Sequence, residues 1–294
     1  MQFKTQANLH RVQAQPKHFK RATSKALLSA IAMTTSLSFF NQAEAVVLFR
    51  DTFSRAAGTD LNASGSGKSG LFGSSDWVES SNGRLANGDA VIVSGNRMEL
   101  QKPGGDANGN NGAMIYIDNN FSNLSSFRVD MRVLSGSSAG NGRFFGFSVG
   151  QSKAELDAQN SASPTAAPGD FSIFYDSIGS TKGIYTRKNG GSSTLIQTAT
   201  PYPRTLSAEF TFADMNAGTA LDYDILLDGT VIGSGSTAWS GTGENYVSLQ
   251  SNYTGFSRIN FVEVSGEIAP DPIPEPSSLS LLGLSGLLIF RRRR

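Results

Sequence analysis

Between residues 46 and 268 the sequence alternates between apolar and polar positions over short stretches. Over 127–133, four apolar residues fall on one face of an extended chain, and Arg128, Asp130 and Arg132 fall on the other. The alternation recurs over 206–212 and 259–264. A period of two residues is typical of a half-buried strand, so each of these stretches predicts a β-strand.

Shorter apolar stretches, separated by turn residues, predict further strands. These are expected at 46–49, 91–93, 98–100, 113–117, 144–149, 171–175, 184–187, 194–197, 223–227, 230–232 and 247–249. Asn189-Gly190 and Asp228-Gly229 are pairs that favour tight hairpin turns. The one helix expected here is short, from Lys153 to Gln159. About a dozen short strands without a long helix predict an all-β fold, an antiparallel two-sheet sandwich.

The order of landmarks along the chain narrows this class. Phe49 opens the body in the segment 49–54, and Trp77 follows a glycine-rich loop. The segment 222–229 lies late in the chain, and a closing strand over 258–264 returns to the first. This layout resembles the concanavalin A-like jelly roll, the architecture of laminin G-like domains and legume lectins, over residues 46–268. A sandwich of the immunoglobulin type is the alternative.

The N-terminal segment has the pattern of a secretory leader. Residues 1–25 contain six basic residues and no acidic one, and an uncharged stretch follows over 26–40. Ala43 and Ala45 then form a small-x-small cleavage site. The pattern predicts a signal peptide over 1–45, cleaved so that Val46 becomes the N-terminus, with signal peptidase and the secretion machinery as partners. A permanent membrane helix is the alternative, but the apolar run is short and diluted by serine and threonine.

The C-terminal residues combine three unlike features after a Pro-rich spacer over 269–273. Pro274-Glu275-Pro276 is held extended, because each proline fixes φ and lacks an N–H. The uncharged apolar run 277–290 predicts a short membrane helix of about 21 Å, against a bilayer core of about 30 Å. Arg291-Arg292-Arg293-Arg294 ends the chain. Because basic clusters stay on the cytoplasmic side, the body is expected on the opposite side of the inner membrane.

This order of features resembles the PEP-CTERM sorting signal of Gram-negative bacteria, over residues 274–294. The resemblance implies recognition and processing by exosortase, an integral membrane protein. It also implies transient residence in the inner membrane and delivery to the cell surface or the extracellular matrix. A simple C-terminal membrane anchor is the alternative. The signal describes a destination and leaves the activity open.

Composition limits the chemistry of the body. Val46 to Phe290 contains 15 basic and 23 acidic residues, a net charge of about −8, which disfavours nucleic acid and anionic lipid as partners. His10 and His18 both lie in the predicted leader, and the chain has no cysteine. The exported form therefore cannot build a Ser-His-Asp triad, a thiol nucleophile, a disulfide or an ordinary zinc site.

Two groups of oxygen ligands remain as candidates. Asp106, Asn108 and Asn110 match the first three ligand positions of an EF-hand loop, which makes Ca²⁺ the one cofactor to consider. The rest of that motif is missing, so a plain loop between strands is favoured over a metal site. Asp222 and Asp224 share one face of a strand, at a spacing of roughly 6.5–7 Å that a pair of glycosidase carboxylates could use.

That pair is nevertheless expected to be noncatalytic. Tyr223 and Ile225 take the buried face of the strand and leave both aspartates in water, where a carboxyl is a poor general acid. The chain also lacks the Glu-x-Asp-x-(x)-Glu strand pattern that glycosidases of the concanavalin A-like fold typically carry. No catalytic residue is therefore assigned.

Aromatic residues are the candidates for ligand binding. Trp239 lies in a turn-rich segment and Trp77 follows a glycine-rich loop, so either ring could stack on a sugar, although packing in the core or at its rim is favoured for each. The sequence predicts a noncatalytic surface or matrix protein, with exopolysaccharide as candidate ligand. A glycan hydrolase or lyase is the alternative, and a structural protein without a ligand is not distinguished by the sequence.

Overall fold

The computed structural model describes residues 45–56, 61–62, 67–79, 90–93, 95–101, 112–136, 144–158, 169–176, 182–198, 204–240, 243–252 and 256–268. These residues form two antiparallel β-sheets and one short helix, α1 (Lys153–Ala158). The predicted two-sheet sandwich is confirmed.

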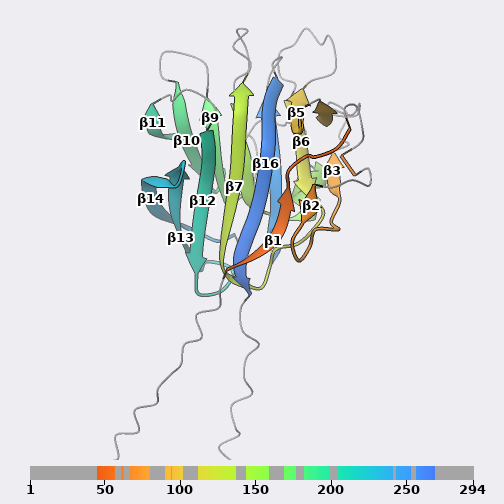
Figure 1. The fold of residues 1–294 in the computed structure, drawn as a ribbon. Helices are drawn as coiled ribbons and strands as arrows, with labels where there is room; N and C mark the ends of the chain where they lie inside the picture. The colour runs from red at the N-terminus through yellow and green to blue at the C-terminus, as the bar shows by residue number, and fades with distance from the viewer. Residues whose placement is uncertain are drawn as a thin grey trace, which may run out of the picture. The chain divides into compact units, whose positions relative to one another are not determined.

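Sheet A contains nine strands. Its main order is β14 (Thr230–Ala238), β13 (Ala220–Leu227), β12 (Arg204–Phe212), β7 (Leu124–Gly136), β16 (Phe256–Ile268), β1 (Val46–Asp51) and β2 (Lys68–Ser69). Two further strands extend it, because β5 (Arg97–Gln101) pairs with β16 and β4 (Ala90–Val93) pairs with β5. Figure 1 shows β12, β7, β16 and β1 side by side. The closing strand β16 lies beside the first strand β1, as predicted.

Sheet B contains seven strands. Its order is β11 (Thr194–Thr198), β10 (Gly183–Lys188), β9 (Phe171–Asp176), β8 (Phe144–Gln151), β15 (Tyr246–Asn252), β6 (Gly112–Ile117) and β3 (Trp77–Glu79). Every pairing in both sheets is antiparallel. The strands β2 and β3 were not predicted, because two or three residues carry too little periodicity to detect.

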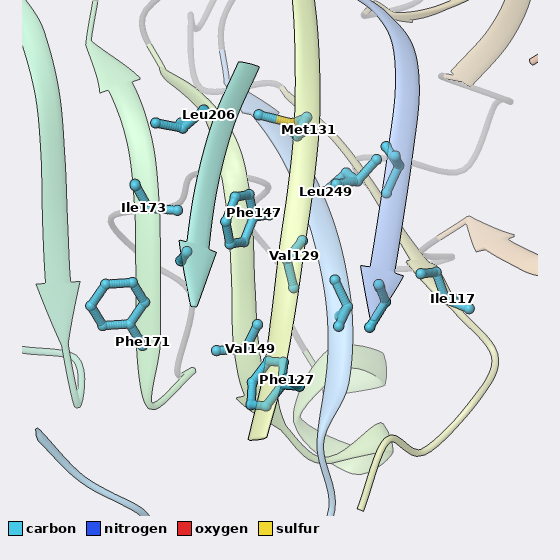
Figure 2. Packing of buried hydrophobic residues seen from close by; sticks show 14 of the residues in the cluster. Ile117, Phe127, Val129, Met131, Phe147, Val149, Phe171, Ile173, Leu206 and Leu249 are labelled. Atoms are coloured by element: carbon cyan, nitrogen blue, oxygen red, sulfur yellow. The ribbon is translucent and has the colours of Figure 1, made fainter. Parts of the chain in front are cut away.

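The core lies between the facing sides of the two sheets. Phe127, Val129 and Met131 of β7 are at most 1% exposed, and the charged residues between them point outward. Figure 2 shows these side chains in one cluster with Phe147 and Val149 of β8. The alternation over 127–133 therefore predicted the buried face correctly.

The local signals for turns and for the helix also hold. Asp228 and Gly229 join β13 to β14 with φ of 49° and 78°, the left-handed geometry that a tight hairpin requires. Helix α1 begins with a capping box, in which Glu155 N–H donates to Ser152 Oγ at 3.1 Å and Ser152 N–H donates to Glu155 Oε2 at 2.8 Å. The turn and the helix depend on residues close in sequence, and both were predicted; the helix was expected to reach Gln159, which lies outside the described residues, and the capping box was not predicted.

Strand β14 is longer than the predicted 230–232. It continues through Gly233 and Gly235 to Ala238. Because glycine has no Cβ, these two positions allow other side chains to approach the strand closely. A Cβ on Gly235 would lie 2.5 Å from the Tyr223 hydroxyl, and one on Gly233 would lie 2.8 Å from Ile196. Glycine weakens a strand signal in the sequence, and here it permits packing that the sequence does not reveal.

Candidate ligand-binding site

Trp77 lies in the core and not on a binding surface. Its side chain is 2% exposed, and its ring packs edge-on against Phe49 at 5.4 Å and stacks on Phe53 at 6.2 Å between centroids. Its Nε1 donates a hydrogen bond of 2.8 Å to Asp51. The prediction that Trp77 offers its ring to a sugar is therefore wrong.

Trp239 is buried in the same way. It is 3% exposed and stacks on Phe212 at 6.2 Å between ring centroids. Its backbone is fixed by a hydrogen bond to the Thr219 carbonyl and one from the Gly218 N–H, both of 2.9 Å. The prediction of a stacking platform at Trp239 is also wrong, because the turn-rich segment folds the ring inward.

Asp51 holds the loop that follows β1. This carboxylate is fully buried, and its Oδ1 accepts hydrogen bonds from Phe53 N–H at 2.8 Å and Arg55 Nη1 at 3.2 Å. Its Oδ2 accepts from Arg55 Nη2 at 2.7 Å and from Trp77 Nε1 at 2.8 Å. Since the Arg55 side chain is only 2% exposed, this is a buried ion pair with a structural role.

Asp170 is a buried carboxyl that precedes β9. It is 1% exposed, and its Oδ2 accepts a hydrogen bond of 2.9 Å from the Ser240 N–H. Burial raises the pKa of Asp170 to about 6, against the opposing effect of the Ser240 hydrogen bonds. A carboxyl of this pKa can exchange a proton near neutral pH, but it is enclosed and not presented to solvent.

Replacing Asp170 by Asn should flatten the dependence of stability on pH. In the folded protein the pKa of Asp170 is raised above its ordinary value of 3.8. The protonated carboxyl therefore stabilises the fold fully below about pH 4, and this stabilisation is lost as pH rises through about 6. Over this rise in pH we expect the free energy of unfolding of wild type to fall by about 1 to 2 kcal/mol. Each pKa unit corresponds to about 1.4 kcal/mol, and solvent screens part of the effect. Urea unfolding of the full chain at pH 4.5 and 7.5 measures it.

The exposed Asp214→Asn variant is the control, and it should keep the wild-type decline. An identical decline in the Asp170→Asn variant would show that the titration of Asp170 does not affect folding.

Asp222 and Asp224 lie on the outer face of β13, and both are exposed, as predicted. They pair across the sheet with Thr211 and Glu209 of β12. With Ser234 these residues line a small cavity of about 200 Å³. Its lining brings three carboxyl groups together, those of Glu209, Asp222 and Asp224.

The centre of the outer face of sheet B is polar but closed. Ser148, Ser172, Ser248 and Gln250 are each at most 1% exposed. Gln250 Nε2 donates to Ser148 Oγ at 3.2 Å and to Ser248 Oγ at 3.0 Å, and the Ser148 and Ser172 hydroxyls lie 2.7 Å apart. These side chains bond to one another, so this region offers no open site among the described residues.

Several predicted site residues lie outside the described ranges. They are the loop residues Asp106, Asn108 and Asn110, Ala43 of the cleavage site, and the whole sorting motif from Pro274 to Arg294. Within the described ranges, no group of three or more Asp, Glu, His or Cys residues is placed to hold a metal ion. The same part of the chain contains no helix of the length and hydrophobicity that crossing a membrane requires.

A larger cavity, hereafter the sheet A cavity, lies on the outer face of sheet A and has a volume of about 430 Å³. It forms where β16 changes partner along one edge. Strand β5 pairs with β16 as far as Ile259, and β1 pairs with it from Val262 onward. Between these points the register of β16 against β7 shifts, and a bulge of this kind re-aims side chains. As a result the adjacent residues Asn260 and Phe261 both line the cavity.

The lining combines a cation, an aromatic ring and small polar groups. Arg132 of β7 lies between Thr205 of β12 and Phe261 of β16 in the cross-strand register. The end of β1 and the turn before β5 supply the rest. The lining residues are Thr52, Ser54, Asn96, Arg132, Thr205, Asn260 and Phe261, with no carboxylate among them.

Among the described charged residues around the cavity, Arg132 has no partner in an ion pair. Arg204 forms an ion pair with Asp228, whose pKa is lowered first by the hydrogen bond from Thr205 N–H and then by Arg204 and Arg132. No carboxylate of the described residues lies within ion-pair distance of Arg132, which is exposed. The cavity therefore presents a guanidinium with free donors to solvent.

The sequence analysis placed Arg132 on the polar face of its strand but did not identify the cavity. Strict alternation over 259–264 would separate Asn260 from Phe261, and the bulge overrides it. A shift in register depends on which strands pair over long distances, so no local signal could have predicted it.

Comparison with known proteins identifies the C-terminal motif. Residues 272–294 match the family model of the PEP-CTERM protein-sorting motif, which confirms the predicted sorting signal. The motif implies recognition by exosortase and export to the cell surface or the extracellular space. No curated protein matches the chain.

Comparison with solved structures identifies the fold. An endo-1,3-β-glucanase from Streptomyces sioyaensis is similar with a TM-score of 0.50 and 14% identity, over 75% of this chain and 96% of that chain. A β-glucanase from Bacillus licheniformis has a TM-score of 0.44 and 10% identity, over 74% and 96%. A legume lectin-like domain from Entamoeba histolytica has a TM-score of 0.43 and 13% identity, over 64% and 88%. The concanavalin A-like jelly roll is confirmed, and the immunoglobulin alternative is wrong. At these identities the likeness concerns the fold alone.

Proposed function

We propose that the protein is a noncatalytic component of the bacterial cell surface or extracellular matrix that binds polysaccharide in the sheet A cavity. The lining of that cavity carries the proposal. An aromatic ring can pack on the apolar face of a sugar, while amides and hydroxyls bond to its hydroxyl groups. Phe261 supplies the ring, and Asn96, Asn260 and Thr205 supply donors and acceptors. A volume of about 430 Å³ lies within the range of small-ligand sites.

The same lining supports binding without catalysis. Hydrolysis of a glycosidic bond needs two carboxyl groups, one as acid and one as base or nucleophile. The described residues that line the sheet A cavity include none. The route to the surface completes the proposal: cleavage after Ala45 by signal peptidase, a transient stay in the inner membrane, and processing by exosortase.

The test is to measure binding and turnover on the full chain purified in detergent, with β-glucans, galactans and the host's exopolysaccharide. We expect retarded migration in affinity electrophoresis with at least one polymer, and no release of reducing sugar. Phe261→Ala should weaken binding by about tenfold or more, since an aromatic contact and its buried area are lost. Val231→Ala, on the exposed edge strand β14, is the control and should bind as wild type does.

The alternative function is a glycan hydrolase or lyase on the same fold. The observation in its favour is the cavity at Asp222, Asp224 and Glu209, where three carboxylates face solvent together. Turnover that is abolished by Asp222→Asn or Asp224→Asn would overturn the noncatalytic proposal.

A further inference from the structure

We propose that the sheet A cavity selects a glycan segment that carries a carboxylate, such as a uronate, through Arg132. This inference rests on the proposed function, because it names the chemical class that the same cavity takes. Arg132 stands between the Thr205 hydroxyl and the Phe261 ring on neighbouring strands. Thr205, Arg132 and Phe261 therefore form a row of paired residues across β12, β7 and β16, the three strands that lie side by side in Figure 1.

Arg132 lines the cavity and forms no ion pair with a carboxylate of the described residues; Arg97 of β5 likewise forms none, but it is not part of the lining. Arg128, four residues earlier on the same strand, is held by Asp130 at 2.8 Å. Arg204 is paired with Asp228. A guanidinium with free donors can bind a carboxylate through two parallel hydrogen bonds. The structure therefore leaves the guanidinium of Arg132 without an ion pair to any described residue where it lines the cavity.

The rest of the lining suits a sugar acid better than a small inorganic anion. Asn260 also lines the cavity, and its side-chain amide carries both a donor and an acceptor for ligand hydroxyl groups. The Phe261 ring lies 5.7 Å from the guanidinium of Arg50 and is only partly buried. Phosphate or sulfate would use Arg132 but would leave the ring and this acceptor without a partner.

The charge of the body limits how densely the ligand can be charged. Residues 46–290 carry a net charge of about −8, which repels a polymer with a carboxylate on every sugar. At physiological ionic strength this repulsion is screened beyond about 8 Å, whereas direct contact with Arg132 is not. One guanidinium neutralises one carboxylate. We therefore expect a glycan in which uronates are separated by neutral sugars.

The test compares two ligands that differ only in charge. One is a xylo-oligosaccharide with a single glucuronate, and the other is the same oligosaccharide after reduction of its carboxyl group. Each is titrated into the full chain in detergent and followed by calorimetry. We expect the uronate form to bind about tenfold more tightly, because the hydrogen bonds that Arg132 donates then join two opposite charges and can be bidentate.

Arg132→Gln should abolish this preference and leave the affinity for the reduced form within about twofold. Arg128→Gln is the matched control, on the same strand and face, and should keep the preference. Thermal unfolding of each variant confirms that it is folded. Equal affinity for the two ligands, or a preference that survives Arg132→Gln, would overturn the inference and leave polysaccharide binding intact. If wild type bound neither oligosaccharide and none of the polymers tested above, both the inference and the proposed function would be overturned.

Discussion

Replacing Asp51 by Ala should destabilise the β-sandwich by about 3 to 5 kcal/mol, the range measured when one partner of a buried ion pair is removed. The carboxylate is fully buried and accepts four hydrogen bonds, two of them from Arg55. Without it, the Arg55 charge and the Trp77 indole N–H both stay buried without a partner. Urea unfolding of the full chain, followed by tryptophan fluorescence, measures the change.

Two control variants are compared with Asp51→Ala. One removes the indole donor to Asp51, and the other breaks an ion pair on the surface. Trp77→Phe keeps an aromatic side chain, removes the donor to Asp51 and loses some buried ring volume, but it leaves no charge without a partner, so it should cost less than Asp51→Ala. Asp118→Ala breaks an exposed ion pair with Lys153 of similar length, 2.9 Å, and should cost about 1 kcal/mol or less. If Asp51→Ala were no more damaging than Asp118→Ala, the buried network would not be a main support of the loop after β1.

The Asp51 network also explains why the sequence misplaced Trp77. A tryptophan after a glycine-rich loop is compatible with a projecting binding loop or with the core. The choice is made by Asp51, 26 residues earlier, whose carboxylate fixes the indole N–H inside the sandwich. For Trp239 the choice is made by Thr219 and Phe212, which pair with its backbone and cover its ring. Such contacts are long-range, and composition around the tryptophan does not encode them.

The strands were predictable for the opposite reason. On β7, alternate residues between Phe127 and Val133 are buried, and a period of two follows from the geometry of any extended chain. The Asp228-Gly229 turn was predictable because only a few residue types accept its positive φ. Fold class therefore followed from local patterns, and the alternation fixed which residues form the core.

The candidate site was not predictable, because it arises from a break in those patterns. The sheet A cavity opens where β16 changes its partner from β5 to β1, between Ile259 and Val262. The bulge that accompanies the change brings Asn260 and Phe261 to one surface. A regular strand would pair its edge fully and leave no opening, so the irregular point is where a ligand can be held.

The position of the cavity is compatible with a protein that is sorted to the cell surface. Its lining comes from β7, β12, β16 and the segments next to β1 and β5, all within the described body. The sorting motif lies at 272–294, beyond the last strand. Processing at the C-terminus would therefore leave each residue of the cavity in the exported form. Binding and sorting can then be tested with separate variants of the same chain.

The sorting motif gives the second large expected effect. Replacing Pro274-Glu275-Pro276 by three alanines, or Arg291-Arg292-Arg293-Arg294 by four serines, should block most processing in a host that contains exosortase. The reason for this expectation is that proline lacks an N–H and fixes φ, which disfavours helix, whereas alanine favours helix and would alter the motif that is to be recognised. The arginines are expected to favour the cytoplasmic face, since a basic residue contributes about 1 kcal/mol at an anionic membrane surface. The unprocessed precursor should accumulate in the inner membrane.

Cell fractionation and intact-mass measurement distinguish the outcomes. Wild type should reach the surface with a shorter C-terminus, and both motif variants should keep the full mass in the membrane fraction. Pro270→Ala, which lies before the matched residues, is the control and should be processed as wild type is. In a host without exosortase, the wild-type chain should also keep its full mass and stay in the membrane fraction. If either motif variant reached the surface at the normal rate and mass, the motif would act only as a membrane anchor, and recognition by exosortase would have to lie elsewhere in the chain.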